Sequence, residues 1–250
     1  MDDSVERAAQ CIVESQLTIA LTGAGISAES GVPTFRGEEG LWRQYRPEEL
    51  ATPRAFDRDP NLGWEWYAWR RGLISACQPN PAHVTLADME ARLPDFSLIT
   101  QNVDGLHRLA GSQRVLELHG DIWRMRCTRE GTRLVDRTHP LPEVPPRCVD
   151  CGALLRPDVV WFGETLPEDV LQAAFAVSAA CDVMLAVGTS AVVQPAATLP
   201  LMAKQNGAVL VEINPQPTPL TGYADLSLRQ SAAQALPELW ANWQEQLQNS

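Results

Sequence analysis

The sequence predicts an α/β fold: a Rossmann-like parallel sheet flanked by helices, with a small second domain. Three observations predict this class. Short apolar runs of strand length alternate with stretches of helix length, and a glycine-rich turn directly follows the first apolar run, at residues 17–21. In addition, the 250 residues are 45% hydrophobic, which is enough for one large core.

The elements follow one another regularly along the chain. Apolar residues at helical spacing over residues 3–15 predict an amphipathic helix before the first strand. Residues 41–76 combine aromatic side chains with many charges, and prolines at 47, 53 and 60 break them into a small helical module. Further strands are expected at 96–100, 114–118, 182–187, 209–213 and 226–228. Further helices are expected at 80–93, 103–111, 171–180, 197–205 and 231–247.

This pattern suggests a discontinuous domain organisation. The Rossmann-like, nucleotide-binding part is expected at residues 1–40, 78–122 and 154–250. The small domain is expected to combine a helical insert, 41–77, with a cysteine-bearing, zinc-ribbon-like insert, 123–153.

Composition excludes several classes of protein. A net charge of -11 at pH 7 argues against nucleic-acid binding. The chain has no apolar run long enough to cross a membrane and no basic segment at its start, so we expect a cytoplasmic protein without membrane contact. We also expect a monomer. Its six cysteines are too scattered for a secreted disulfide framework.

The glycine-rich turn predicts a nucleotide site. Gly23, Gly25 and Ala28 fit the dinucleotide fingerprint in its Gly/Ala form. Glycines let the backbone approach a ligand closely, and N–H groups at a following helix start suit a pyrophosphate. Pro33 interrupts the helix that an ordinary dehydrogenase would have next, which argues against hydride transfer.

Polar side chains follow two of the predicted strands. Gln101, Asn102 and Asp104 come after one, and His119 comes after the next. Ligands of open α/β sheets bind at that edge, where amide and carboxylate groups can orient a ribose or a carboxamide. An imidazole titrates near working pH, so His119 could be a general base, although a lone histidine at a strand end is often structural.

Five blocks resemble the sirtuin family of NAD-dependent protein lysine deacylases. They are GAGISAESGVPTFRG at 23–37, TQNVDGLH at 100–107, LHG at 118–120, VWFGE at 160–164 and GTS at 188–190. The resemblance spans residues 17–236 and implies one catalytic domain over 1–250. It implies NAD as co-substrate, acylated protein lysines as partners, and nicotinamide, free lysine and O-acyl-ADP-ribose as products.

The resemblance also implies roles for individual residues. His119 would be the catalytic base, and Asn102 and Asp104 would be catalytic too. Val160, Phe162 and Glu164 would border the acyl-lysine tunnel. The implied NAD-binding residues are Gly23, Ala24, Gly25, Ser27, Ala28, Phe35, Arg36, Trp42, Gln101, Asn102, Val103, Asp104, Gly188, Thr189, Ser190, Asn214, Pro215, Gln216 and Ala232.

Tyr67 and Arg70 indicate a more specific substrate. Three residues apart, they share one face of a helix, and a guanidinium with a phenol can bind a carboxylate. The alternative interpretation, without a role in binding, is a surface arginine beside a packed tyrosine. The stretch is similar to the sirtuin subclass that removes succinyl and malonyl groups, in which such a pair binds the acyl carboxylate. Ala51 matches the subclass position that leaves room for the longer acyl group, and weaker deacetylation is expected as well.

The cysteine motif departs from the family pattern. Sirtuins normally carry two Cys-x-x-Cys pairs that bind a structural zinc. Here Cys148 and Cys151 form one pair, but Cys127 is followed three residues later by Glu130. Glu130 could be the fourth ligand, and His139 or Asp136 are alternatives. A metal-free loop is also possible.

Two other functions stay open at this stage. The incomplete cysteine motif would suit a non-catalytic sensor of NAD or ADP-ribose. A protein ADP-ribosyltransferase is the other alternative. Asn102, Asp104 and His119 weigh against the sensor.

Overall fold

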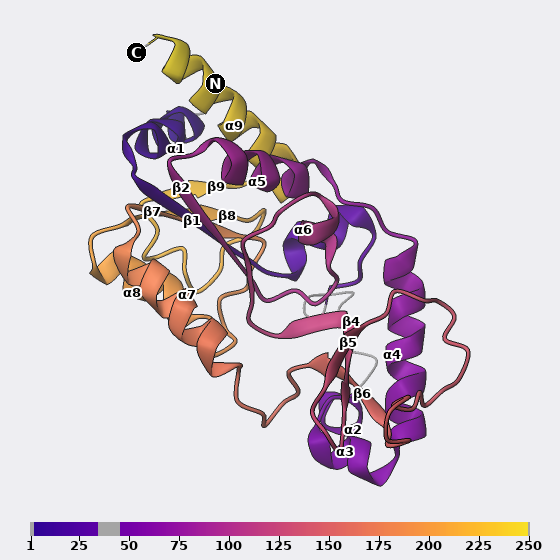
Figure 1. Cartoon of the computed structure of the whole chain (residues 1–250). Helices are drawn as coiled ribbons and strands as arrows, with labels where there is room; N and C mark the ends of the chain where they lie inside the picture. Colours follow the sequence, from indigo (N-terminus) through magenta and orange to yellow (C-terminus); the bar gives the residue numbers. More distant parts are fainter. Residues whose placement is uncertain (1–2, 35–45, 250) are drawn as a thin grey trace.

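The computed structural model describes residues 3–34 and 46–249 (Figure 1). Its main layer is a six-stranded parallel sheet with strand order β3-β2-β1-β7-β8-β9. The strands are β1 (Leu17–Thr22), β2 (Asp95–Thr100), β3 (Val115–Glu117), β7 (Val183–Val187), β8 (Val209–Ile213) and β9 (Leu226–Leu228). The strand order reverses at β1, which lies between β2 and β7, so a ligand crevice is expected at the carboxyl ends of these strands.

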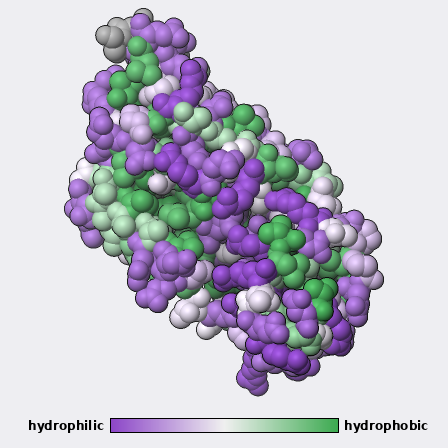
Figure 2. Space-filling model, viewed as in Figure 1, coloured by the Kyte–Doolittle hydropathy of each residue, from purple (hydrophilic) through white to green (hydrophobic). Residues whose placement is uncertain are grey.

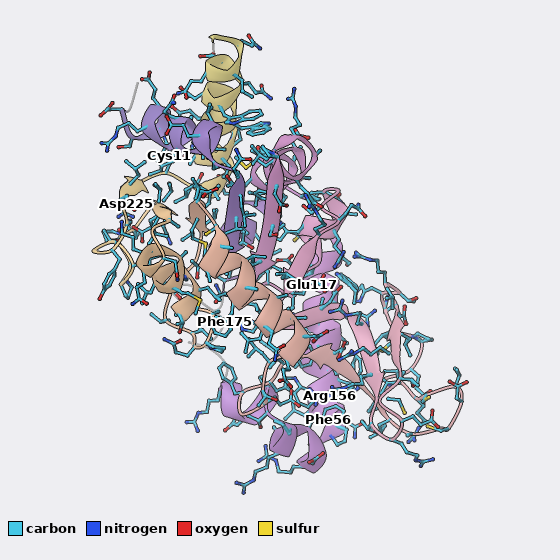
Figure 3. All side chains as sticks on the ribbon, turned by 60° about the vertical axis from the view of Figure 1, so that its left-hand side comes forward. Cys11, Phe56, Glu117, Arg156, Phe175 and Asp225 are labelled. Carbon is cyan, nitrogen blue, oxygen red and sulfur yellow. The ribbon has the colours of Figure 1, made fainter. Side chains whose placement is uncertain are left out.

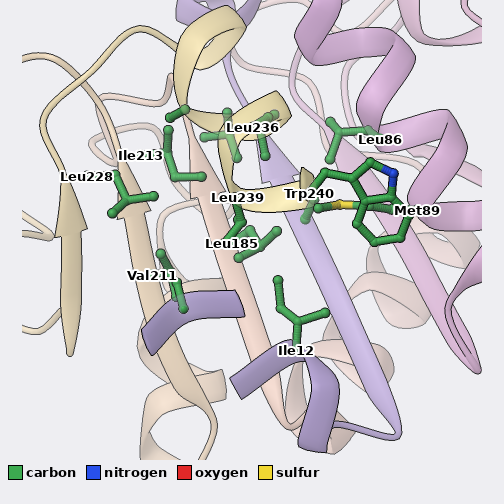
Figure 4. Close-up of a cluster of buried hydrophobic side chains, with 14 of the residues drawn as sticks. Ile12, Leu86, Met89, Leu185, Val211, Ile213, Leu228, Leu236, Leu239 and Trp240 are labelled. Carbon is green, nitrogen blue, oxygen red and sulfur yellow. The ribbon is translucent and has the colours of Figure 1, made fainter. Parts of the chain in front are cut away.

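Helices cover both faces of this sheet. One face carries α1 (Asp3–Glu14), α5 (Pro81–Arg92) and α9 (Ala232–Asn249), which pack on the apolar cluster of Figure 4. The other carries α7 (Glu168–Ala180) and α8 (Thr198–Gln205). Side chains of β7 alternate between the two clusters and all five are buried, as is typical of parallel strands covered on both faces.

A smaller part of the molecule lies beyond the carboxyl edge of the sheet, at the lower right of Figure 1. It contains an antiparallel sheet of β4 (Gly120–Cys127), β5 (Arg133–Val135) and β6 (Leu155–Val159). The helices α2 (Pro47–Leu50), α3 (Pro53–Arg58) and α4 (Pro60–Ser75) pack with it around a common apolar cluster. Each of these helices begins at a proline, where the missing N–H costs no hydrogen bond, so the predicted breaks are helix starts.

The fold class is as predicted, and the observed boundaries lie within three residues of the predicted ones. The largest differences are at α6 (Leu106–Leu109) and α7, which were expected to start at 103 and 171. The segment after Gly23 forms a 3-10 helix, η1 (Ala24–Ser30), that ends at Gly31 in the left-handed conformation. The predicted domain boundary at residue 122 falls inside β4, and the proposed division into domains stays a prediction.

Hydrophilic residues cover most of the face shown in Figure 2, with hydrophobic groups between them. Within residues 3–34 and 46–249, no helix combines the length and apolarity that a membrane crossing requires.

Candidate active site

A cavity of about 560 Å³ lies between the carboxyl edge of the parallel sheet and the smaller part of the molecule. One wall comes from the turns that follow four parallel strands, with Gly23, Gln101, Gly188 and Asn214. The opposite wall comes from α4 and the segment that follows β6. The cavity therefore lies at the predicted crevice of the α/β sheet.

Two glycine turns interlock at the base of this cavity. The N–H of Gly25 donates to the carbonyl of Gly188 at 2.8 Å. A Cβ added at Gly25 would lie 2.7 Å from that carbonyl oxygen, and Gly188 itself has a φ of +57°. Only glycine permits this approach, which leaves main-chain groups lining the cavity where a pyrophosphate could bind.

Amide side chains hold the same turns in place. Gln101 Nε2 donates to Thr189 Oγ1 at 2.8 Å, and Asn214 Nδ2 donates to the Thr189 carbonyl at 3.1 Å. Asn102 Nδ2 donates to the Gly23 carbonyl at 3.1 Å. All of these residues line the cavity, so the turns after four different strands form one connected surface.

His119 lies at this surface, and one hydrogen bond defines which of its ring nitrogens carries the proton. Its Nδ1 is 2.8 Å from the carbonyl oxygen of Gln101, which can only accept, so Nδ1 carries the proton and Nε2 has the free lone pair. Burial lowers the pKa of His119, and the bond to Gln101 opposes this only partly. A neutral imidazole with a free Nε2 is the form that a general base requires.

Asp104 lies behind the cavity wall and not in it. Its buried carboxylate accepts from Ser27 Oγ at 2.8 Å and from the N–H of Leu106 at 2.9 Å. Burial raises the pKa of Asp104, while these two bonds oppose the rise. Ser27 Oγ also accepts from Asn102 Nδ2 at 3.2 Å. Asp104 is therefore connected to the cavity wall by hydrogen bonds through Ser27 and Asn102.

His83 belongs to the same buried network, as sequence reasoning did not anticipate. It forms a capping box with Asn80 at the start of α5. Its Nε2 also lies 3.3 Å from Ser27 Oγ, and its ring is 4.9 Å from that of His107. Burial lowers the pKa of His83 to about 4, so the ring is neutral at pH 7.

The opposite end of the cavity is lined by aromatic side chains and one guanidinium group. Tyr67 and Arg70 both line it from α4 and are 3% and 6% exposed. Trp161 Nε1 donates to the Tyr67 hydroxyl at 2.8 Å, which leaves the phenol proton for another acceptor. The N–H of Phe162 donates to the carbonyl of Ala51 at 2.9 Å, so these two predicted residues lie side by side.

Glu164 also lines the cavity, but its carboxylate is already bound. Arg156 donates to both of its oxygens, at 2.6 and 2.8 Å, and the N–H of Trp161 donates at 2.8 Å. Burial opposes ionisation, but these bonds outweigh it and lower the pKa of Glu164. Arg156 also lies over the Trp161 ring. Figure 3 shows Arg156 close to Phe56, whose ring contacts that of Trp161. Glu164 therefore shapes the segment after β6.

Several predicted residues are not in the cavity wall. The described ones that do not line it are Ser27, Ala28, Asp104, Pro215 and Ala232. Ala232 packs in the apolar cluster below the sheet. Phe35, Arg36 and Trp42 lie outside the described residues. Trp66, Trp161 and Thr218 line the cavity and were missed, although Trp161 lies between two predicted residues, Val160 and Phe162.

The cysteine cluster has the composition of a metal site. One ligand atom each from Cys127, Glu130, Cys148 and Cys151 lies within 4.8 Å of the others. Four such atoms from soft and hard donors fit a tetrahedral zinc ion. The alternative ligands Asp136 and His139 are not in this group: Asp136 accepts from the N–H of Thr138, and the His139 ring packs against Gly72 of α4.

The fold and the cavity define an α/β protein of the dinucleotide-binding class, with an imidazole beside two glycine turns. Comparisons with known proteins agree. The family model described as Sir2 family matches residues 23–195. An NAD-dependent protein deacylase of Aquifex aeolicus is 55% identical, over 91% of this chain and 95% of the relative. One of Pyrococcus furiosus is 54% identical, over 91% and 93%. The chain belongs to the Sir2, or sirtuin, family.

Solved structures give the same result. A mutant Sir2 homologue in complex with ADP ribose is 50% identical and has a TM-score of 0.94, with 100% of this chain and 99% of that chain covered. A Sir2 homologue in complex with NAD is 51% identical and has a TM-score of 0.91, with 97% and 94% covered. A Sir2 protein bound to a myristoylated histone peptide is 32% identical, with a TM-score of 0.81 and 100% of both chains covered.

Proposed function

We propose that this chain removes succinyl and malonyl groups from protein lysines, and acetyl groups more slowly. The coarser activity follows from the family: the chain is an NAD-dependent protein deacylase. The finer specificity is supported by one observation, the position of Tyr67 and Arg70 together in the cavity wall. A buried guanidinium and a phenol with a free proton suit an acyl chain that ends in a carboxylate.

Residue roles within the proposed reaction are those that the family resemblance implies, and the positions of these residues in the cavity wall support them. Bound NAD supplies the labile glycosidic bond and the ribose that receives the acyl group. His119 Nε2 takes the proton of a ribose hydroxyl, since Nδ1 is held by Gln101. The turns at Gly23 and Gly188 bind the phosphates, and Asn102 and Gln101 orient the ribose and the carboxamide. Val160, Phe162 and Ala51 border the acyl-lysine.

The direct test uses three matched peptides with acetyl-, malonyl- or succinyl-lysine, incubated with NAD and the purified protein. We expect the mass of each peptide to fall by its acyl group, with higher kcat/KM for the two acidic groups. A faster acetyl reaction would contradict the specificity and leave the activity intact. NAD binding without any deacylation would favour the sensor, and transfer of label from NAD to protein would favour the ADP-ribosyltransferase.

We also propose that Cys127, Cys148, Cys151 and Glu130 bind one structural zinc ion. No residue near the cluster is expected to activate a metal-bound water, so the role of the ion would be structural. It would hold the loops after β4 and before β6 together. Metal analysis should give one zinc per chain. Glu130→Cys should slow the loss of zinc to a chelator and Glu130→Ala should speed it. Asp150→Asn should not change this rate, because Asp150 is an exposed residue between Cys148 and Cys151 that is not in the cluster. Equal rates for all variants would exclude Glu130 as a ligand.

The cellular context stays a proposal. All six cysteines are free, which suits a reducing compartment such as the cytoplasm. The net charge of -11 suits an enzyme that acts on proteins without nucleic acid. The monomeric state stays a prediction, which light scattering can check.

A further inference from the structure

Glu212 is a charged residue inside the parallel sheet. It lies in β8 between Val211 and Ile213, both in the apolar core, and is 1% exposed. A carboxylate in such a position requires dedicated hydrogen-bond donors. Arg229 Nη2 donates to its Oε2 at 2.6 Å, and the hydroxyl groups of Thr218 and Thr221 also donate to the carboxylate.

These donors come from the chain that follows β8, and they connect Glu212 to the cavity wall. Arg229 also donates through Nη1 to the carbonyls of Asn214 and Gln216, at 3.3 and 3.4 Å. Asn214, Gln216 and Thr218 line the cavity, whereas Glu212 and Arg229 do not. The ion pair of the buried Glu212 and the partly exposed Arg229 therefore holds the main chain and one side chain of the loop 214–218 from behind.

We infer that Glu212 and Arg229 are positioning residues for NAD: they fix the loop 214–218 as a preformed wall for one end of the nucleotide. The inference rests on the proposed placement of NAD along the carboxyl edge of the sheet. The loop lies next to the turn after β7, through the bond from Asn214 to Thr189, and Tyr67 lies on the opposite wall. Loss of the pair should therefore weaken NAD binding without changing acyl-peptide binding.

The test is Glu212→Gln, which keeps the shape of the side chain and removes its charge. We expect KM for NAD to rise roughly ten-fold, which corresponds to about 1.4 kcal/mol. The kcat at saturating NAD and KM for the acyl peptide should change by less than about two-fold. Calorimetric titration with ADP-ribose should show the same loss of affinity, and this measurement does not depend on deacylation.

Two further variants separate positioning from general stability. Glu245→Gln makes the same charge change at an exposed site on α9 and should leave both KM values unchanged. Arg229→Lys keeps the ion pair but loses the fork that reaches the carbonyls of Asn214 and Gln216, so it should also raise KM for NAD. It serves as well if Glu212→Gln does not fold.

An unchanged KM for NAD in both Glu212→Gln and Arg229→Lys would overturn the inference, as would a parallel fall in kcat with constant KM values, since that indicates fewer folded molecules. Absence of deacylation in the parent protein, with normal ADP-ribose affinity, would instead contradict the proposed reaction alone.

Discussion

Replacement of Arg70 by Met tests the acyl-carboxylate pocket. The Arg70 side chain lines the cavity and is 6% exposed, so an acyl carboxylate that binds there is largely shielded from water. Removal of the cation from such a pair costs roughly 3–5 kcal/mol. At about 1.4 kcal/mol for each factor of ten, kcat/KM for the succinyl peptide should fall roughly 100- to 4,000-fold. An acetyl group has no carboxylate, so its kcat/KM should change by less than about three-fold.

The assay compares succinyl and acetyl peptides of identical sequence at saturating NAD, with product mass as readout. Arg58→Met, at an exposed position on α3, is the matched control and should affect neither substrate. The melting temperature must be measured too, because Arg70 also interacts electrostatically with the buried Asp104. Equal losses for both acyl groups would refute the reasoning and make Arg70 a structural residue. Tyr67→Phe should reduce kcat/KM for the succinyl peptide only, because it removes one hydrogen bond to the acyl carboxylate.

Three other predictions concern the base and the backbone behind it. His119→Tyr should abolish NAD-dependent deacylation, and since burial lowers the pKa of His119, the parent rate should be constant above pH 7 and fall only below pH 6.5; full activity of the variant would exclude this base. Gly120→Ala should lower the melting temperature and the rate together, because Gly120 has a φ of +81° and a Cβ there would overlap the Asp158 carbonyl; urea titration measures the stability loss. His83 is neutral in the folded protein down to about pH 4, so the unfolded state binds more protons below pH 6.5. The free energy of unfolding should therefore fall by roughly 3 kcal/mol as the pH is lowered from 6.5 to about 4. Chemical denaturation of His83→Asn should lack this part of the pH dependence.

Local signals were enough to predict the layers of the fold. The five residues of β7 are all apolar and all buried, and a run of that length bounded by polar residues has few alternatives to a strand. Gln101 and His119 were placed at one edge because parallel strands bring their following turns together. The catalytic roles of Asn102 and His119 came from the family resemblance and stay predictions; the structure places both residues, with Gly23, in the wall of one cavity.

Contacts between segments far apart in the chain could not be predicted from the sequence. Nothing near Glu164 indicates that Arg156 would occupy both of its oxygens, because β6 and the turn after it fold back only in three dimensions. The same applies to His139, which packs against α4 and not beside the cysteines. Ala232 starts the last helix on the far side of the sheet from α7 and packs in the core.

The strand β4 begins directly after His119 and ends at Cys127. The imidazole base and the first thiol of the cysteine cluster are thus opposite ends of one continuous piece of backbone. None of the described residues that line the cavity is a cysteine. Inactivation by a reagent specific for thiols would therefore start outside the described cavity wall. It would give no reason to search for a sulfur nucleophile.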